Sequence, residues 1–300
     1  MSGFETRLDV IAKKVSEALE SELGGRLLAG EIARPERLLA AMRHGALNGG
    51  KRLRPFLVIE SAALFGVSTD KAMCTALALE CMHCYSLVHD DLPAMDNDDL
   101  RRGKPTVHVA YDDATAILAG DSLLTFAFDL LADPRSHDNP AIRSELVLQL
   151  ARAAGMGGMA GGQMLDLQAE SQVPDEAGIR LLQSMKTGAL LRYACEAGAI
   201  LGAASEDDQA RLRDFGIRIG QAFQLADDIL DITSTTEKMG KKVAKDAAAG
   251  KGTLVELYGL ERARTMAETL VAEAMALLEP FGEKAATLKA CASYIVERGK

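Results

Sequence analysis

The sequence predicts an all-α protein. Of its 300 residues, 48% are hydrophobic but only 4% are aromatic, and none is Trp. This composition favours a helical core of Ala, Leu, Ile, Val and Met, because strands favour aromatic and β-branched residues. Apolar residues recur at helical spacing almost everywhere, and no segment alternates as a half-buried strand would.

Turn chemistry divides this pattern into helices. The breaks are Gly24-Gly25, Gly49-Gly50, Gly103-Lys104-Pro105, Asp133-Pro134, Val173-Pro174-Asp175 and Glu279-Pro280. Helices are expected at roughly 4–23, 35–48, 54–65, 70–90, 107–131, 140–160, 175–203, 206–231, 253–278 and 283–297. Because no linker, low-complexity stretch or fixed repeat interrupts the chain, we predict one domain over residues 1–300.

Residues 233–253 depart from the helical pattern, being polar, punctuated by glycine and rich in lysine. A solvated surface loop is the ordinary interpretation of such a stretch. Here it directly follows an aspartate cluster, so we predict a mobile lid.

The formal net charge of −9, from 34 basic and 43 acidic residues, gives no basic face for nucleic acid. Five cysteines without framework spacing indicate a reducing cytosol. Cys81 and Cys84 flank His83 in an apolar helix and have no second pair, so they are interpreted as core residues and not as a zinc half-site. The N-terminus lacks the h-region of a signal peptide, and no run of about 18 uncharged apolar residues occurs. We therefore predict a cytoplasmic protein without a membrane span.

Two aspartate clusters carry most of the net charge. DDLPAMD at 90–96 is followed by Asp98 and Asp99, and DDILD occupies 227–231. Carboxylates repel one another and weaken a helix interior, so the clusters call for a cation. Mg²⁺ is the natural candidate because it binds through one or two carboxylates plus substrate phosphates.

Helix geometry separates the roles of these side chains. Asp227 and Asp231 share a helix face about 6 Å apart, whereas Asp228 points about 100° away. Asp90 and Asp96 differ by about 240° on an ideal helix, so they converge only if the helix kinks or ends between them. Pro93 supplies a cause for such a break.

Cationic motifs accompany the clusters. RRGKPTVH at 101–108 follows the first cluster, and GGKRLRP at 49–55 follows a glycine turn. Guanidinium groups suit phosphate oxygens, so metal-bound and Arg/Lys-bound diphosphates are expected side by side. The apolar helices 77–88 and 215–229 lead into the clusters, which indicates a substrate with a diphosphate head and a hydrocarbon tail.

These motifs resemble those of the short-chain trans-prenyl diphosphate synthases, most closely the bacterial farnesyl diphosphate synthases. In order, the matching segments are GGKRLRP, ECMHCYSLVHDDLPAMDNDDLRRGKPTVH, AGDSLL, GGQMLDL, KTGAL, FQLADDILD and the Gly240-Lys241 and Gly250-Lys251 loop. The resemblance implies a single-domain orthogonal helical bundle of the isoprenoid synthase type, with about ten or more helices around a central hydrophobic cavity. It also implies a homodimer.

By the same resemblance, three Mg²⁺ ions, with Mn²⁺ as a substitute, bind the allylic diphosphate. The implied metal ligands are Asp90, Asp96 and Asp227, with Asp91 and Asp231 close behind. The allylic diphosphate contacts are Arg101, Lys186, Lys241 and Lys251. Isopentenyl diphosphate is held by Lys51, Arg54, His83 and Arg102, with Arg52 nearby. Thr187 and Gln224 face the allylic cation. For Asp121, Gln163 and Asp166, direct contact and helix packing remain open.

Product length is predicted from Tyr85, which lies five residues and so about 7.5 Å below Asp90 along the helix. By resemblance, an aromatic residue there beside Ser86 indicates farnesyl diphosphate, made from isopentenyl and dimethylallyl or geranyl diphosphate. A geranylgeranyl product remains the alternative. Two other functions fit the motifs less well. A terpene cyclase would not need the isopentenyl diphosphate site of Lys51, Arg54 and Arg102, and a non-catalytic subunit tends to lose one of the two Asp motifs, both of which are present in this sequence.

Overall fold

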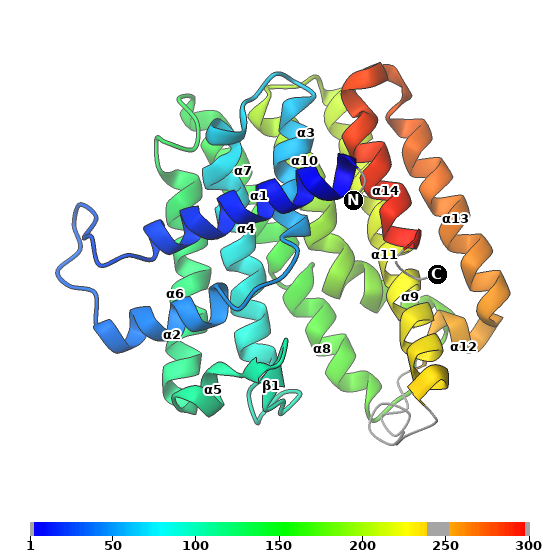
Figure 1. The fold of residues 1–300 in the computed structure, drawn as a ribbon, viewed down its shortest axis with the longest axis horizontal. Helices are drawn as coiled ribbons and strands as arrows, with labels where there is room; N and C mark the ends of the chain where they lie inside the picture. Colours follow the sequence, from blue (N-terminus) through cyan, green and yellow to red (C-terminus); the bar gives the residue numbers. More distant parts are fainter. Residues whose placement is uncertain (1–2, 239–251, 298–300) are drawn as a thin grey trace. The chain divides into compact units, whose positions relative to one another are not determined.

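The structure is a computed structural model that describes residues 3–238 and 252–297, with side chains left out at 234–238 (Figure 1). It confirms the all-α prediction, since the described chain is helical apart from loops and one very short hairpin. Two compact units emerge, and each is described by itself. The first comprises Met1–Ile59 and Val67–Val147, and the second Glu60–Gly66 and Leu148–Lys300. A single domain with a central cavity stays a prediction.

The first unit contains two long neighbouring helices and a hairpin. Its elements are α1 (Gly3–Glu22), α2 (Glu36–Ala46), most of α3 (Leu53–Ala63), α4 (Thr69–Asp90), β1 (Leu100–Arg101), β2 (Lys104–Pro105), α5 (Val107–Ala110), α6 (Asp113–Ala132) and the start of α7 (Pro140–Ala154). The strands are antiparallel, with Arg101 opposite Lys104.

The second unit is built around α10 and α11. Its elements are the rest of α7, α8 (Met159–Ala169), α9 (Glu176–Gln183), the π-helical turn η1 (Ser184–Gly188), α10 (Ala189–Leu201), α11 (Glu206–Lys238), α12 (Leu254–Tyr258), α13 (Leu260–Leu277), the 3₁₀ segment η2 (Glu279–Ala285) and α14 (Ala286–Glu297).

Helix ends differ from the prediction where a cap was not recognised. The helix expected at 107–131 is two helices, because Asp112 caps α6 by accepting a hydrogen bond from the amide of Thr115. The helix expected at 140–160 ends at Ala154, and α8 follows it. α11 continues to Lys238, so the predicted lid begins within a helix, and residues 239–251 lie outside the described part of the chain.

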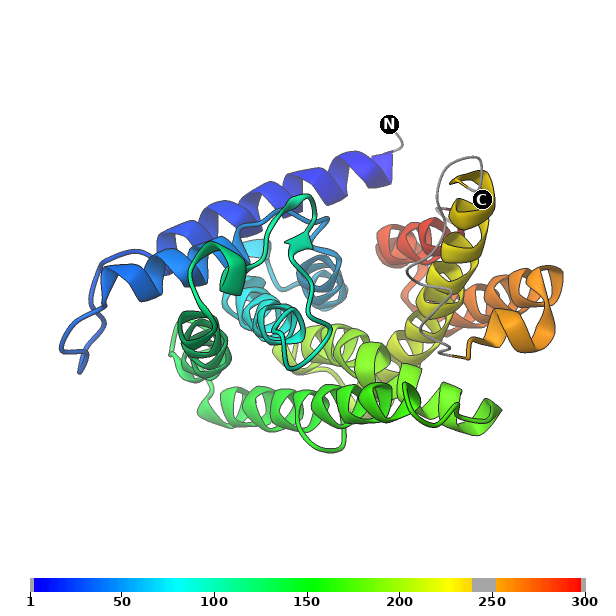
Figure 2. The same cartoon turned by 90° about the horizontal axis from the view of Figure 1, so that it is seen from below.

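The core of the first unit lies where α4 packs along α6, side by side in Figures 1 and 2. Nearly every residue from Ala72 to Met82 on α4 is buried. Gly120 on α6 permits the close approach, since a Cβ there would lie 2.1 Å from Nε2 of His89. That imidazole also hydrogen-bonds the carbonyl of Ile117 at 3.0 Å, which gives His89 a structural role.

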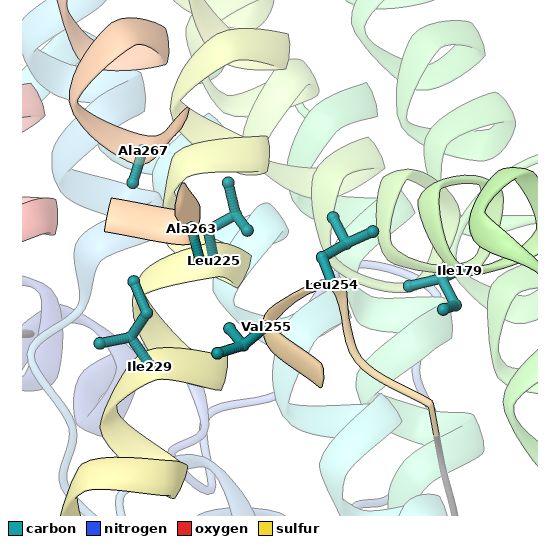
Figure 3. Packing of buried hydrophobic residues seen from close by; sticks show 7 residues of the cluster. All are labelled: Ile179, Leu225, Ile229, Leu254, Val255, Ala263 and Ala267. Atoms are coloured by element: carbon teal, nitrogen blue, oxygen red, sulfur yellow. The ribbon is translucent and has the colours of Figure 1, made fainter. Parts of the chain in front are cut away.

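The second unit has its own hydrophobic cluster, which joins α9, α11, α12 and α13 (Figure 3). Its members are Ile179, Leu225, Ile229, Leu254, Val255, Ala263 and Ala267. Thr253 and Glu256 form a capping box that fixes the start of α12. The cluster therefore anchors the chain immediately after the undescribed segment.

Among the described helices, only α6 is long and apolar enough to cross a membrane by length and composition. About two-fifths of its apolar window (39%) is buried in the protein, and the core helix of a soluble protein passes the same test. The absence of a membrane span stays a prediction. All five cysteines are free, and burial raises the pKa of Cys84 to about 12, which keeps this thiol protonated.

Candidate active site

The first aspartate cluster surrounds the end of α4. The helix ends at Asp90, before Pro93, and the chain turns back so that the amide of Asp96 donates to the carbonyl of Asp90 at 2.9 Å. Asp90 is half-buried and Asp96 is exposed. The expected helix end between these two carboxylates is therefore present.

Asp91 differs from both of its neighbours because its side chain is buried. Nε and Nη2 of Arg101 lie 2.7 and 2.5 Å from the same Asp91 Oδ1. Burial nevertheless raises the pKa of Asp91. A predicted metal ligand and a predicted phosphate ligand are thus paired, which ties β1 to the end of α4.

The hairpin presents a second arginine. Arg102 and Gly103 form its two-residue turn with φ of +53° and +76°, the signs of a type I′ turn. The Arg102 guanidinium donates to the carbonyl of Gly49. Gly50 has φ of +106°, a backbone conformation that favours glycine, and the Arg102 guanidinium lies against it.

The Gly49–Arg54 loop sends its basic side chains in different directions. Lys51 is exposed, and Nη1 of Arg54 lies 3.4 Å from Nε2 of His83. Burial and the nearby arginines, Arg54 first, hold the pKa of His83 well below its usual value, so the imidazole is neutral. Arg52 was expected near the substrate. Its side chain instead points into the protein and is 1% exposed, so it does not line an open site.

Tyr85, the residue predicted to limit product length, lies on α4 five residues before Asp90. Tyr85 is half-buried, and its ring makes an edge-to-face contact with His89 at 5.8 Å between centroids. Burial raises the pKa of the Tyr85 phenol. Ser86 donates to the carbonyl of His83 at 2.8 Å, which satisfies its hydroxyl within the helix. Met82 is fully buried.

In the second unit, the three aspartates of α11 have different surroundings. Asp227 is half-buried and Asp231 is exposed. Asp228 is buried, and it accepts hydrogen bonds from Nε2 of Gln183 at 2.9 Å and Nε2 of Gln224 at 3.1 Å. Burial raises the pKa of Asp228 to about 6.

Lys186 and Thr187 lie in the π-helical turn η1, which interrupts the helix between α9 and α10. Nζ of Lys186 lies 2.7 Å from Oδ2 of the buried Asp166 on α8. Gly162 allows this approach, since a Cβ there would lie 2.2 Å from the backbone nitrogen of Lys186. For Asp166, the structure thus shows an ion pair with a predicted diphosphate ligand. π-turns of this kind are frequent at functional sites.

The donor chemistry of each cluster fits Mg²⁺. Among residues 3–238 and 252–297, no three His, Cys, Asp or Glu side chains gather into a ready-made metal site. Each cluster instead presents accessible carboxylates, Asp90 and Asp96 in the first unit and Asp227 and Asp231 in the second. Mg²⁺ prefers this arrangement, because substrate phosphates and water complete its coordination. Lys241 and Lys251, predicted phosphate ligands, lie outside the described residues.

The sequence matches the polyprenyl synthetase profile over residues 35–295. The chain belongs to the polyprenyl synthetase family. It is 43% identical to the farnesyl diphosphate synthase of Escherichia coli K12, with 99% of each chain covered. It is equally 43% identical to the large subunit 1 of a heterodimeric chloroplastic geranylgeranyl pyrophosphate synthase from Arabidopsis thaliana, covering 99% of this chain and 80% of that one.

Solved structures agree with this family assignment. An FPP/GFPP synthase from Zymomonas mobilis, in its apo form, superposes with a TM-score of 0.86 at 44% identity, covering 98% of both chains. A geranyltransferase from Legionella pneumophila gives 0.85 at 33% identity, covering 98% of this chain and 97% of that one. The helical fold expected from the resemblance is thus that of known family members.

Two site partners were not predicted from the sequence. Gln183 bonds Asp228, 45 residues away, and Glu80 pairs with Arg52, 28 residues away. Neither has a local signal, because a glutamine or glutamate inside a helix is ordinary surface composition. Only the tertiary fold identifies them.

We expect Asp228→Asn to flatten part of the pH dependence of stability. In metal-free wild type, the native state binds the Asp228 proton more tightly than the unfolded chain, since its pKa is about 6 against 3.8. This contribution to the free energy of unfolding is complete below pH 3.8 and is lost as pH rises through about 6. Urea titrations in EDTA between these limits measure it. Equal slopes for wild type and variant would contradict the raised pKa, and exposed Asp231→Asn serves as the control.

Proposed function

We propose that this chain is a prenyl diphosphate synthase that makes farnesyl diphosphate in the cytoplasm. It would condense isopentenyl diphosphate with dimethylallyl and then geranyl diphosphate. The observation that carries the proposal is the donor set of the described residues in a member of this family: accessible carboxylates in both clusters, and the basic side chains of Arg54 and Arg102 near His83. A terpene cyclase would not need those basic side chains, and a partner subunit would not need both clusters.

In the proposed reaction, Lys51, Arg54 and Arg102 bind isopentenyl diphosphate, and His83 orients Arg54. Arg101 and Lys186, with Lys241 and Lys251, bind the allylic diphosphate. Asp90 and Asp96 of the first unit, with Asp91 close by, and Asp227 of the second, with Asp231 close by, would hold Mg²⁺, which would supply positive charge to stabilise the departing pyrophosphate.

The chemistry then needs no protein nucleophile. The allylic C–O bond breaks and its electron pair leaves with pyrophosphate. The isopentenyl double bond supplies the electrons of the new C–C bond, and a pyrophosphate oxygen takes the proton that is lost. Gln224 donates its amide N–H to Asp228, which leaves its carbonyl oxygen for the cation, together with the hydroxyl of Thr187. Such preorganised dipoles are a major source of rate enhancement.

Geranylgeranyl diphosphate is the competing product, because this chain is 43% identical both to a farnesyl diphosphate synthase and to geranylgeranyl pyrophosphate synthases, so identity favours neither. Tyr85 is the feature that favours farnesyl diphosphate. Its ring is braced by His89 and cannot move aside without losing that contact.

The first test is product analysis with labelled isopentenyl diphosphate, dimethylallyl diphosphate and Mg²⁺. We expect farnesol after dephosphorylation of the wild-type product, and longer alcohols from Tyr85→Ala, because a smaller side chain deepens the tail pocket. Tyr111→Ala, an aromatic truncation elsewhere in the first unit, is the control and should keep the product. If Tyr85→Ala leaves the distribution of product lengths unchanged, Tyr85 does not limit product length, and Met82 is the next residue to test. Release of pyrophosphate without chain elongation would indicate a terpene cyclase. The absence of both activities would indicate a non-catalytic partner subunit.

Carboxylate substitutions test the metal sites. We expect Asp90→Asn and Asp227→Asn each to lower kcat by about 10²-fold or more, the scale of losing one stabilising group in the transition state. Each should also raise the Mg²⁺ concentration needed for half-maximal rate. Exposed Asp113→Asn at the start of α6 is the matched control and should keep wild-type kinetics. A normal Mg²⁺ requirement in both cluster variants would refute the ligand assignment.

We further propose that two copies form a homodimer. On α6, Ile117 and Leu118 are large apolar side chains that are 45% and 56% exposed, and a partner would cover them. Sedimentation equilibrium should give twice the monomer mass of 32.0 kDa. A concentration-independent monomer would contradict the proposal, and Ile117→Asp should shift a dimer toward monomer.

A further inference from the structure

Arg52 is the most unusual basic residue of the first unit. It has a left-handed backbone, with φ of +51°, in the loop between α2 and α3. Its side chain is 1% exposed, although arginine is rarely buried without a partner. A non-glycine residue with this backbone and a buried charge both cost free energy, so the surrounding structure must compensate for them.

Two contacts supply the compensation. Nη1 of Arg52 lies 2.5 Å from Oε1 of Glu80, whose side chain is 3% exposed within α4. Nη2 donates to the carbonyl of Ala46 at the end of α2 at 2.7 Å, and Cys84 Sγ contacts the same carbonyl at 3.9 Å. The guanidinium fork therefore holds three segments together: the end of α2, the Gly49–Arg54 loop and the middle of α4.

The same loop carries the groups assigned to isopentenyl diphosphate. Lys51 precedes Arg52, and Arg54 reaches His83, which lies one turn beyond Glu80 on α4. Arg102 contacts the loop at Gly49. The charges of Arg54, Arg102, Arg52 and Arg101 all act on His83, so these cations lie within electrostatic reach of one point.

Mutual repulsion would push such a group apart, and two buried anions lie among these arginines: Asp91 pairs with Arg101, and Glu80 pairs with Arg52 in the loop itself. We propose that the Arg52–Glu80 ion pair is a positioning device that holds the Gly49–Arg54 loop in the geometry that binds isopentenyl diphosphate. Arg52 is thus a positioning residue and does not touch the substrate. This inference rests on the proposed function for the identity of the anion.

The kinetic test separates positioning from general stability. Arg52→Met and Glu80→Gln should each raise KM for isopentenyl diphosphate about 10- to 100-fold, the scale of a small misplacement of binding groups. KM for the allylic substrate should stay within about twofold, since Asp90, Asp96 and Lys186 are not held by this pair. Arg52→Lys should be intermediate, because an ammonium group lacks the fork that bonds Glu80 and Ala46 together.

Two controls guard against a merely structural effect. Glu196 in the second unit is a buried glutamate held by Arg192 and Arg213 at 2.7 Å each, so Glu196→Gln removes a matched charge elsewhere. It should lower thermal stability without changing the ratio of the two KM values. The double variant Arg52→Met with Glu80→Met removes both charges and should regain stability while keeping the raised KM.

Titration calorimetry with inorganic pyrophosphate in EDTA measures anion binding by Lys51, Arg54 and Arg102 in the absence of turnover. Arg52→Met should weaken this binding about tenfold or more relative to wild type, by the same misplacement. If wild type makes no prenyl product but this loss occurs, the proposed function fails and the positioning role stands. Equal shifts in both KM values, a double variant with normal KM, or unchanged pyrophosphate binding would each overturn the inference.

Discussion

In each unit, the pairing of buried or half-buried charges is the interaction on which the candidate site residues depend. Each charged side chain that fixes the local backbone has a partner within its own unit. Arg101 pairs with Asp91, Lys186 with Asp166, and Arg52 with Glu80. Asp228 is held by two amides and needs no cation. These pairs fix the backbone around the more exposed groups, such as Asp96 and Asp231, which are then presented to solvent and ligand.

The aspartates of each cluster have different roles, which explains why each cluster holds more carboxylates than are needed as metal ligands. Neighbouring aspartates within one cluster lie in different environments, because a helix turns about 100° per residue. Asp90 and Asp91 differ in burial at the end of α4, as Asp228 and Asp231 do on α11. One member of each run anchors the structure and the others remain accessible.

The sequence predicted the parts of the fold that depend on local chemistry. The helix expected at 70–90 is α4 at Thr69–Asp90, because an apolar run begins at the Ser68 cap and ends before Pro93. Helix α8 was not predicted, since Gly161 and Gly162 weaken its local signal and serve close packing instead. The break before α6 was also missed, because Asp112 could be part of a helix or its cap. The candidate site residues taken from family motifs stay predictions, and the motifs did not indicate that Arg52 points inward, a direction set by a glutamate 28 positions away.

Under the proposed function, the end of α4 binds metal and Tyr85 limits product length, so both roles fall on one helix. An α-helix rises about 1.5 Å per residue, so residues along one helix lie at fixed depths below its end. Tyr85 and Met82 lie at successive depths, and α4 packs along α6, where Gly120 leaves room for the His89 ring. His89 also contacts the Tyr85 ring, so the packing of α4 against α6 supports the position of the residue proposed to limit product length. If Tyr85 limits product length as proposed, one side chain on this helix would distinguish the products of relatives whose overall identities to this chain are equal.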